Sequence, residues 1–347
     1  MNYASFPTSC RTVSANFSRR EPPRTHDQPA GDDDRRLRGV ISLDARTLAQ
    51  ALPYPALIDA INDAFKGGVT VPLRAHHTIQ GLEGGSDNTL LLMPAWSDDG
   101  FIGVKTAVVA PDNRKLGLPA VQATYQLLER ETGRPLASMD GPMLTARRTA
   151  AASALAARYL APKGASKLLM IGTGLLAGEL PLAHAAVRPI SAVKVWGRDP
   201  AKAGATAETL SCAGLNAEPT TDLEEAVGWA DIVSAATLSR EPLIQGAWLY
   251  PGQHVDLVGA FRPDMREADD VAVTRARVFC DTREGALKEG GDLAQPLRDG
   301  VFSAEDVEGD LFDLAVGQVA IQRHVDDITL FKSTGTALED LAGAMLA

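Results

Sequence analysis

Three basic residues stand in sequence contexts where a lone charge is unusual. Arg74 follows a proline-leucine pair, Lys105 lies inside a strongly apolar run, and Arg148 lies near the start of an alanine-rich segment. A guanidinium or ammonium group in such a setting can hold a carboxylate through charge-assisted hydrogen bonds. On an alternating strand the same side chains could instead face solvent. The three cations are therefore candidates for a carboxylate clamp, with solvated positions as the alternative.

A glycine-rich turn supplies a second kind of chemistry. It follows an apolar run at 168–171 and precedes an alanine-rich segment, and it consists of Gly172, Thr173, Gly174, Leu175, Leu176 and Ala177. The glycines permit a tight turn and close approach to a pyrophosphate, Ala177 keeps helix and strand close, and a helix N-terminus supplies amide groups. An ordinary strand-to-helix turn is the alternative. Because a second apolar strand follows at 193–196, the pattern predicts a dinucleotide site.

The end of that second strand bears on which dinucleotide binds. Gly197 and Arg198 stand where an NAD site usually carries an acidic side chain for the ribose 2′-hydroxyl group. An arginine can pair with a 2′-phosphate, which favours NADPH. Asp199, the next residue, could turn inward and accept the ribose hydroxyl group. NADH is therefore the alternative cofactor.

Composition restricts the class of protein. The chain has 347 residues, of which 45% are hydrophobic and 22% charged, with a formal net charge of −10. Its length predicts two domains, and its charge disfavours nucleic acid or an anionic membrane as partner. No apolar run is long enough to span a bilayer. Three widely separated cysteines form neither a disulfide framework nor a zinc site, so we expect a cytoplasmic protein.

Other candidate groups give weaker signals. His76 and His77 are adjacent, so they would face opposite ways on a strand, and no histidine spacing indicates a metal site. We interpret Asp292 and the acidic residues at 305–310 as a solvated acidic region. The chain has no Gly-x-Ser-x-Gly pattern, which argues against a serine hydrolase.

The elements that must position these residues follow an extension at 1–38. Its prolines, acidic run and lack of apolar periodicity predict disorder. The acid-free composition of residues 1–20 is that of a transit peptide, although a non-functional or misassigned start is favoured. Apolar spacing then predicts helical structure from about 44 to 66, and short strands are expected at 71–79, 89–94, 101–109 and 136–140.

A helix at 144–160 should lead into an alternation of strands and helices. Strands at 167–171, 193–196, 231–235, 254–258 and 277–281 predict at least five strands of a doubly wound sheet. The segment 328–333 and the helix after it are expected to lie outside that sheet and to return to the first unit. The predicted fold is α/β, with a Rossmann-type dinucleotide-binding domain at 146–324. A discontinuous α+β substrate and dimerisation domain is expected at 39–145 plus 325–347.

Several motifs together resemble one known family. They are Gly103-Val-Lys105-Thr with Pro111-Asp-Asn113, Arg148-Thr-Ala-Ala-Ala-Ser, Gly172-Thr-Gly174, Val195-Trp-Gly-Arg198, Ala230-Asp-Ile-Val-Ser-Ala-Ala-Thr237 and Phe331-Lys-Ser-Thr-Gly335. In order and type they are similar to the ornithine cyclodeaminase/μ-crystallin family, from about residue 40 to the C-terminus. Each motif alone is weak, but the ordered set is specific.

The resemblance implies a homodimer with a substrate site in its first domain. It assigns the substrate carboxylate to Arg74, Lys105 and Arg148, with Lys105 and Arg148 as catalytic residues, and it requires no metal. Ser333 would line the nicotinamide pocket. The other cofactor contacts that it implies, besides the glycine-rich turn, are Trp196, Gly197, Arg198, Ala236, Thr237 and Gly259.

One departure separates branches of the family. Phe261 stands where ornithine cyclodeaminases carry an aspartate, and Asp264, three residues later, could replace it in space. The surrounding Gly-Ala-Phe-x-Pro-x-Met-Arg-Glu-x-Asp pattern resembles the Δ1-pyrroline-2-carboxylate reductase branch, which acts in hydroxyproline and D-amino-acid catabolism. This implies reduction of a cyclic imino acid to L-proline or L-pipecolate with NADPH or NADH. The alternatives are a cyclodeaminase with bound NAD, an open-chain dehydrogenase of alanine type, and a μ-crystallin-like binding protein.

Overall fold

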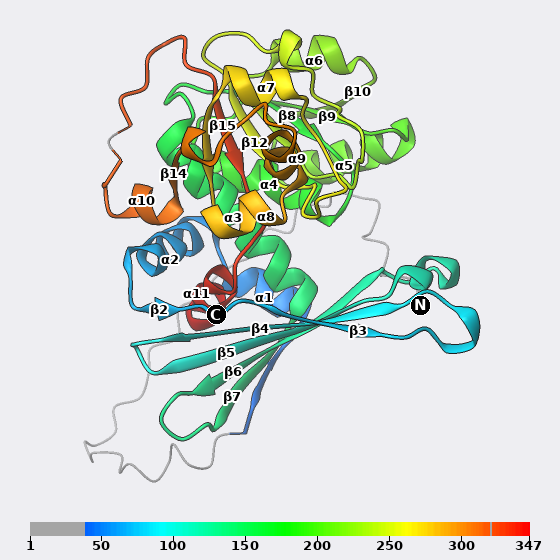
Figure 1. Ribbon diagram of the computed structural model, residues 1–347, viewed down its shortest axis with the longest axis vertical. Coiled ribbons are helices and arrows are strands. Elements are labelled where there is room, and N and C mark those ends of the chain that lie inside the picture. Colours follow the sequence, from blue (N-terminus) through cyan, green and yellow to red (C-terminus); the bar gives the residue numbers. More distant parts are fainter. Residues whose placement is uncertain (1–38, 320) are drawn as a thin grey trace, which may run out of the picture.

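The computed structural model describes residues 39–319 and 321–347 (Figure 1). The extension at 1–38, for which the sequence predicts disorder, lies outside the described residues. The described chain forms two units, each built on one sheet, with helices between them (Figure 1). None of its helices is long and apolar enough to cross a membrane.

The first unit contains a mixed sheet of seven strands in the order β1-β7-β6-β5-β4-β2, with β3 also paired to β4. Only β1 and β7 run parallel. The strands are β1 (Ile41–Leu43), β2 (Val69–Thr70), β3 (Ala75–Ile79), β4 (Asn88–Ser97), β5 (Phe101–Val109), β6 (Val121–Glu129) and β7 (Pro135–Asp140). The sequence analysis missed β6. It also missed β2 and began the next strand at 71, whereas β3 begins at Ala75, after Pro72, a residue with no amide proton for the ladder.

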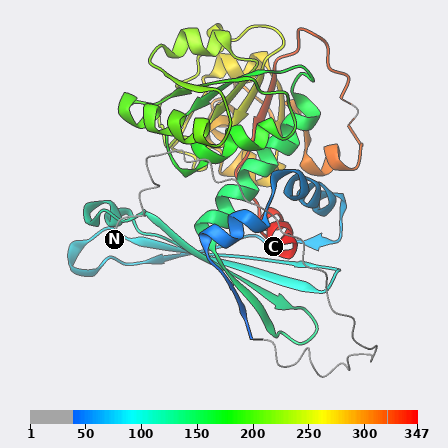
Figure 2. The ribbon, with the colours of Figure 1, turned by 180° about the vertical axis from the view of Figure 1, so that it is seen from behind.

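Four helices pack between the two sheets: α1 (Ala45–Ala51), α2 (Tyr54–Lys66), α3 (Gly141–Leu160) and α11 (Ala337–Leu346). The periodicity over 44–66 resolves into two helices because Pro53 separates them. Helix α11 contacts β4, β5 and β6, and α2 packs on α3 and α11. Helix α3 connects the two units (Figure 2), contacting α1, α2 and α11 of the first and α4, β12 and β15 of the second.

The second unit is an eight-stranded parallel sheet in the order β10-β9-β8-β11-β12-β15-β13-β14. The strands are β8 (Lys167–Ile171), β9 (Ala192–Trp196), β10 (Ala217–Thr220), β11 (Ile232–Ala235), β12 (His254–Leu257), β13 (Arg277–Cys280), β14 (Val307–Asp310) and β15 (Thr329–Lys332). Its helices are α4 (Leu175–Ala185), α5 (Pro200–Cys212), α6 (Leu223–Trp229), α7 (Asp270–Arg275), α8 (Arg283–Lys288), α9 (Gly291–Arg298) and α10 (Leu311–Ala315). The doubly wound sheet expected from the sequence is therefore confirmed.

The expectation for the C-terminal segment was wrong in one respect. Strand β15 does not leave the parallel sheet but lies inside it, paired with β12 on one side and β13 on the other. All four of its residues are buried, as parallel-sheet strands covered on both faces require. Only α11 returns to the first unit, so the chain crosses between units just after Lys332.

Candidate active site

The three predicted cations gather around the start of helix α11. Lys105 Nζ lies 2.6 Å from Asp340 Oδ2, and Arg148 Nε lies 2.9 Å from Asp340 Oδ1. Arg148 also pairs with Glu339. Lys105 and Arg148 are each 4% exposed, so a solvated position is wrong for both of them. Arg74 is half-buried and donates to the carbonyl oxygen of Gly335 at 2.8 Å.

Local structure explains how each cation reaches the cluster. On β5 alternate side chains point inward, which places Lys105 on the face covered by α11. Arg148 lies against Gly335, where a Cβ atom would stand 2.4 Å from Arg148 Nη1 and where φ is +78°. Glycine at this turn therefore permits both the backbone conformation and the close approach of the guanidinium group.

Burial and pairing set the charges of this cluster. Burial lowers the pKa of Lys105 to about 8, although Asp340 opposes the shift. Burial acts to raise the pKa of Asp340, but Arg148 and Lys105 together hold it below its usual value. Asp340 is therefore ionised at neutral pH, and Lys105 can give up a proton near neutrality.

Asp281 holds the turn that carries two of the predicted positions. Its buried carboxylate accepts hydrogen bonds from the amides of Thr334 and Gly335, both at 2.6 Å, and from Ser333 Oγ at 3.3 Å. This contact fixes Ser333 and Gly335 relative to the end of β13. Sequence reasoning missed Asp281, whose only signal is its place directly after an apolar strand.

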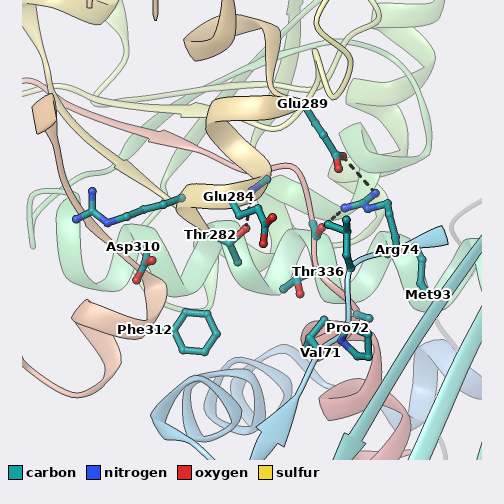
Figure 3. Close-up of a pocket in the computed structure, with 15 residues that line it drawn as sticks. Val71, Pro72, Arg74, Met93, Thr282, Glu284, Glu289, Asp310, Phe312 and Thr336 are labelled. Carbon is teal, nitrogen blue, oxygen red and sulfur yellow. Dashed lines mark hydrogen bonds and ion pairs between the residues drawn. The ribbon is translucent and has the colours of Figure 1, made fainter. Parts of the chain in front are cut away.

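A cavity of about 310 Å³ opens beside Arg74, between the two units. Figure 3 shows Arg74 reaching from the first unit toward Glu289 of the second, with Nη1 3.6 Å from Glu289 Oε2. Met93, the cross-strand neighbour of Lys105, also lines the cavity. The remaining polar side chains of its wall are Thr282, Arg283, Glu284, Asp310 and Thr336.

The glycine-rich turn lies at the carboxyl ends of the parallel strands. Gly172 has φ of +127°, and a Cβ atom there would stand 2.7 Å from the carbonyl oxygen of Ala236. Gly174 precedes α4 without a side-chain cap, so the first amides of that helix are available to an anion. Strands β9 and β11 lie on opposite sides of β8, which makes this the point where strand order reverses. These features fit a dinucleotide.

The other predicted cofactor positions lie close to this turn. A Cβ atom at Gly197 would be 2.5 Å from Thr173 Cγ2, and one at Gly259 would be 2.2 Å from the carbonyl oxygen of Thr237. Trp196 ends β9 and its carbonyl oxygen accepts from the amide of Gly172. The exposed and partly buried residues Leu175 and Leu176 begin α4, and Ala177 is buried beneath them.

Arg198 and Asp199 differ in their hydrogen-bond partners. Arg198 is exposed just beyond the end of β9. Asp199 caps α5, accepting from the amides of Ala201 at 3.0 Å and Lys202 at 3.4 Å. The carboxylate that could have bound the ribose is thus occupied at a helix terminus, whereas the guanidinium group faces outward.

A buried ionic network lies near Thr237 and Gly259, at the carboxyl edge of the parallel sheet where a cofactor is predicted. It shows that the prediction of a solvated position for Asp292 was wrong. Asp292 is fully buried and pairs with Lys332 at 2.9 Å. Lys332 also donates to the carbonyl oxygen of Gly259, and Glu267 accepts from the amide of Thr237 at 2.6 Å. Burial, with Asp292 nearby, raises the pKa of Glu267 to about 8.

The residues that replace the cyclodeaminase aspartate lie at the same edge. Phe261 follows β12 and is 42% exposed. Asp264 is held at the surface by Arg262 at 2.9 Å and Arg240 at 3.2 Å. Asp264, Lys105 and Arg148 do not themselves line the cavity beside Arg74, but Met93 and Gly335, the neighbours of Lys105 and Arg148, do. Within the described ranges, His76 and His77 are exposed, and no cluster of histidine, cysteine or acidic side chains is arranged to hold a metal ion.

Comparison with known proteins gives consistent matches over nearly the whole described chain. The model of the ornithine cyclodeaminase/mu-crystallin family matches residues 44–347. A Delta(1)-pyrroline-2-carboxylate reductase of Paracoccus denitrificans is 41% identical over 284 residues, which cover 82% of this chain and 89% of that protein.

Two solved structures share the fold over a similar range. The Thermococcus litoralis Delta(1)-pyrroline-2-carboxylate reductase in complex with NADH and L-proline has a TM-score of 0.82 and 33% identity, covering 88% of this chain and 96% of that one. An archaeal alanine dehydrogenase dimer with bound NAD has a TM-score of 0.80 and 29% identity, covering 88% and 94%.

The buried pair of Lys332 and Asp292 gives a stability prediction. Replacing Lys332 with Met removes the counter-charge of Asp292 inside the sheet and should lower the free energy of unfolding by about 3–5 kcal/mol. Urea denaturation measures this. The control is Lys288→Met, which removes a lysine from an exposed pair with Glu284 and should leave the unfolding curve unchanged. Equal stability of the two variants would contradict a role for Lys332 as counter-charge.

Proposed function

The chain belongs to the ornithine cyclodeaminase/mu-crystallin family, and on that basis we propose that it reduces Δ1-pyrroline-2-carboxylate to L-proline with NAD(P)H. The observation that carries this proposal is the convergence of Arg74, Lys105 and Arg148 on Gly335 and the start of helix α11 that follows it. The turn that contains Gly335 leads out of the sheet whose carboxyl edge fits a dinucleotide. Such a site can bind an anionic substrate beside a hydride donor.

Reduction of the imine requires a hydride at C2 and a proton at the ring nitrogen. When bound, NAD(P)H supplies the hydride. We propose that Arg74, Lys105 and Arg148 hold the substrate carboxylate and that Lys105 also orients the imine nitrogen or donates the proton to it. The lowered pKa of Lys105, about 8, suits a group that transfers a proton near neutral pH. Positioning and electrostatics then account for most of the catalysis.

The replacement of the cyclodeaminase aspartate is consistent with this chemistry. Phe261 cannot accept a proton, and Asp264 is engaged by two surface arginines. Reduction of a preformed imine needs no base to deprotonate a substrate amine. The absence of the aspartate is therefore consistent with a reductase. The cavity of about 310 Å³ is at the lower end of the range for small-molecule sites and accommodates a five- or six-membered imino acid.

The proposal is tested by supplying Δ1-pyrroline-2-carboxylate with NADPH or NADH and measuring cofactor oxidation and L-proline formation. L-Ornithine with NAD is assayed for ammonia in parallel. We expect rapid oxidation of the cofactor with the imine and no ammonia from ornithine. Lys105→Met should lose turnover while retaining cofactor binding, whereas Lys66→Met, at an exposed position, should behave as wild type. Ammonia release without net cofactor consumption would instead identify a cyclodeaminase.

We further propose that NADPH is preferred over NADH. Arg198 is exposed at the carboxyl end of β9 and Asp199 is occupied as a helix cap, which favours recognition of a 2′-phosphate. Two of the similar solved structures contain NADH or NAD, so this proposal rests on Arg198 and Asp199 of this chain and not on those structures.

Substituting Arg198 tests this preference. Because hydrogen bonds to charged groups contribute about 1.5–3 kcal/mol, Arg198→Ala should weaken NADPH binding about tenfold or more and leave NADH binding nearly unchanged. Fluorescence titration of both cofactors measures the two dissociation constants. Arg46→Ala, on α1, is the control and should affect neither. Equal losses for both cofactors would contradict recognition of the 2′-phosphate.

We also propose that the chain forms a homodimer through the outer face of its mixed sheet. In Figures 1 and 2 the helices of the described chain lie on one side of this sheet. On the other side, strand alternation places apolar side chains that are only partly buried, among them Leu92, Trp96, Ile102, Val104 and Leu128. A contiguous apolar face of this kind is typical of protein interfaces.

A charge on this face should disrupt the dimer. Val104→Glu places a carboxylate at its centre and should convert the protein to a monomer, as measured by light scattering after size-exclusion chromatography. Val271→Glu introduces the same charge at an exposed position on α7 and should leave the mass unchanged. A dimer that persists in the Val104 variant, or a monomeric wild type, would contradict this interface.

A further inference from the structure

The fully buried part of the cation cluster contains as many acidic as basic groups, and Arg74, half-buried at its edge, is paired with Glu289. Lys105 and Arg148 contribute two positive charges, and Glu339 and Asp340 contribute two negative charges when both are ionised. These four side chains are between 0% and 5% exposed. A fully ionised cluster is therefore neutral, and a substrate carboxylate entering it would add an uncompensated charge where water does not screen it.

The two acids of the cluster are not equivalent. Asp340 places one oxygen against Lys105 and the other against Arg148. Glu339 gives only Oε2 to Arg148, whereas its Oε1 is buried without a hydrogen-bond partner among the described residues. An unpartnered carboxylate oxygen in the interior is costly, and a proton on it would remove both the charge and part of that cost.

The surroundings of Glu339 contain charges of both signs. Arg148 faces it from α3, Asp281 from the end of β13, and Asp340 is its neighbour on α11. Lys105 on β5 stands beyond Asp340. Burial raises the pKa of Glu339 to about 7, with Asp281 and Asp340 adding to the effect and Arg148 opposing it. Glu339 is thus the acid of this cluster that can exchange a proton near neutral pH.

We propose that Glu339 takes up a proton when a carboxylate binds to Lys105 and Arg148, so that the substrate enters as an anion accompanied by a proton. Protonated Glu339 leaves the cluster with a net charge of +1, which the bound carboxylate balances. This inference rests on the proposed function, since it requires the cluster to bind a carboxylate. Glu339 acts through Arg148 and is a positioning residue.

The sign of the pH dependence follows from linkage. A bound anion raises the pKa of Glu339, so the complex holds more protons than the free protein above a pH of about 7. Affinity for a carboxylate should be constant well below pH 7 and should fall by up to about tenfold per pH unit above it. Lys105, with a pKa of about 8, contributes the same kind of uptake at higher pH.

The probe is tetrahydro-2-furoate, a cyclic carboxylate with an ether oxygen in place of the ring nitrogen. It has no group that titrates near neutral pH. Its binding to the protein saturated with NADPH is measured by calorimetry at pH 7.0 in two buffers that differ in ionisation enthalpy. The wild-type protein should take up a measurable fraction of a proton per ligand, because burial raises the pKa of Glu339 to about 7.

Variants assign this proton. Glu339→Gln should still bind the probe, but its proton uptake should fall to the small contribution of Lys105. Glu267→Gln, which changes a buried carboxyl group in the network near Thr237 and Gly259, should retain the wild-type uptake. Uptake unchanged in Glu339→Gln would overturn the inference, as would wild-type binding without proton exchange.

Other outcomes separate this inference from the proposed function. A wild-type protein that binds NADPH but not the probe would contradict the carboxylate site itself. If Glu339→Gln does not fold, the wild-type affinity measured between pH 6 and 9 decides. A decline that begins near pH 7 supports proton uptake by Glu339, whereas affinity that stays constant up to about pH 8, where Lys105 begins to lose its proton, overturns it.

Discussion

The bridge from Asp340 to Lys105 and Arg148 is the interaction on which the rest of the site depends. It joins three elements that are distant in sequence, namely β5, α3 and α11, through a carboxylate that is fully buried. Without Asp340, Lys105 would lose its acidic partner in the interior and Arg148 would keep only Glu339, and burial alone disfavours the charged forms of both cations. The same carboxylate keeps both cations ionised and aimed at one point, which is what a carboxylate clamp needs.

The path of the chain connects these two cations to the carboxyl edge of the parallel sheet. Lys332 ends β15 inside the parallel sheet, where it pairs with Asp292 and donates to the carbonyl oxygen of Gly259. A few residues later Gly335 touches Arg148 and accepts from Arg74. Asp281 fixes the turn between these points. One short crossing therefore sets the position of the cations relative to the strands whose ends fit a dinucleotide.

The parts of this arrangement that the sequence predicts are those encoded locally. The turn at Gly172 and Gly174 can be predicted from the sequence because its glycines, the strand before it and the helix after it are contiguous. The place of β15 was mispredicted, because an apolar run does not reveal which strands it will pair with. Glu339, Asp340 and Asp281 were overlooked, and Asp292 was assigned to solvent, because a buried acid has no sequence signature apart from its distant partner.

A structure of the protein with NADPH and L-proline tests the central claim most directly. The account predicts that the proline carboxylate lies within hydrogen-bond distance of Lys105 and Arg148, with the proline Cα facing the nicotinamide ring at the end of β15. A carboxylate bound instead to the surface arginines Arg240 and Arg262, with Lys105 and Arg148 still paired only to Asp340 and Glu339, would contradict it.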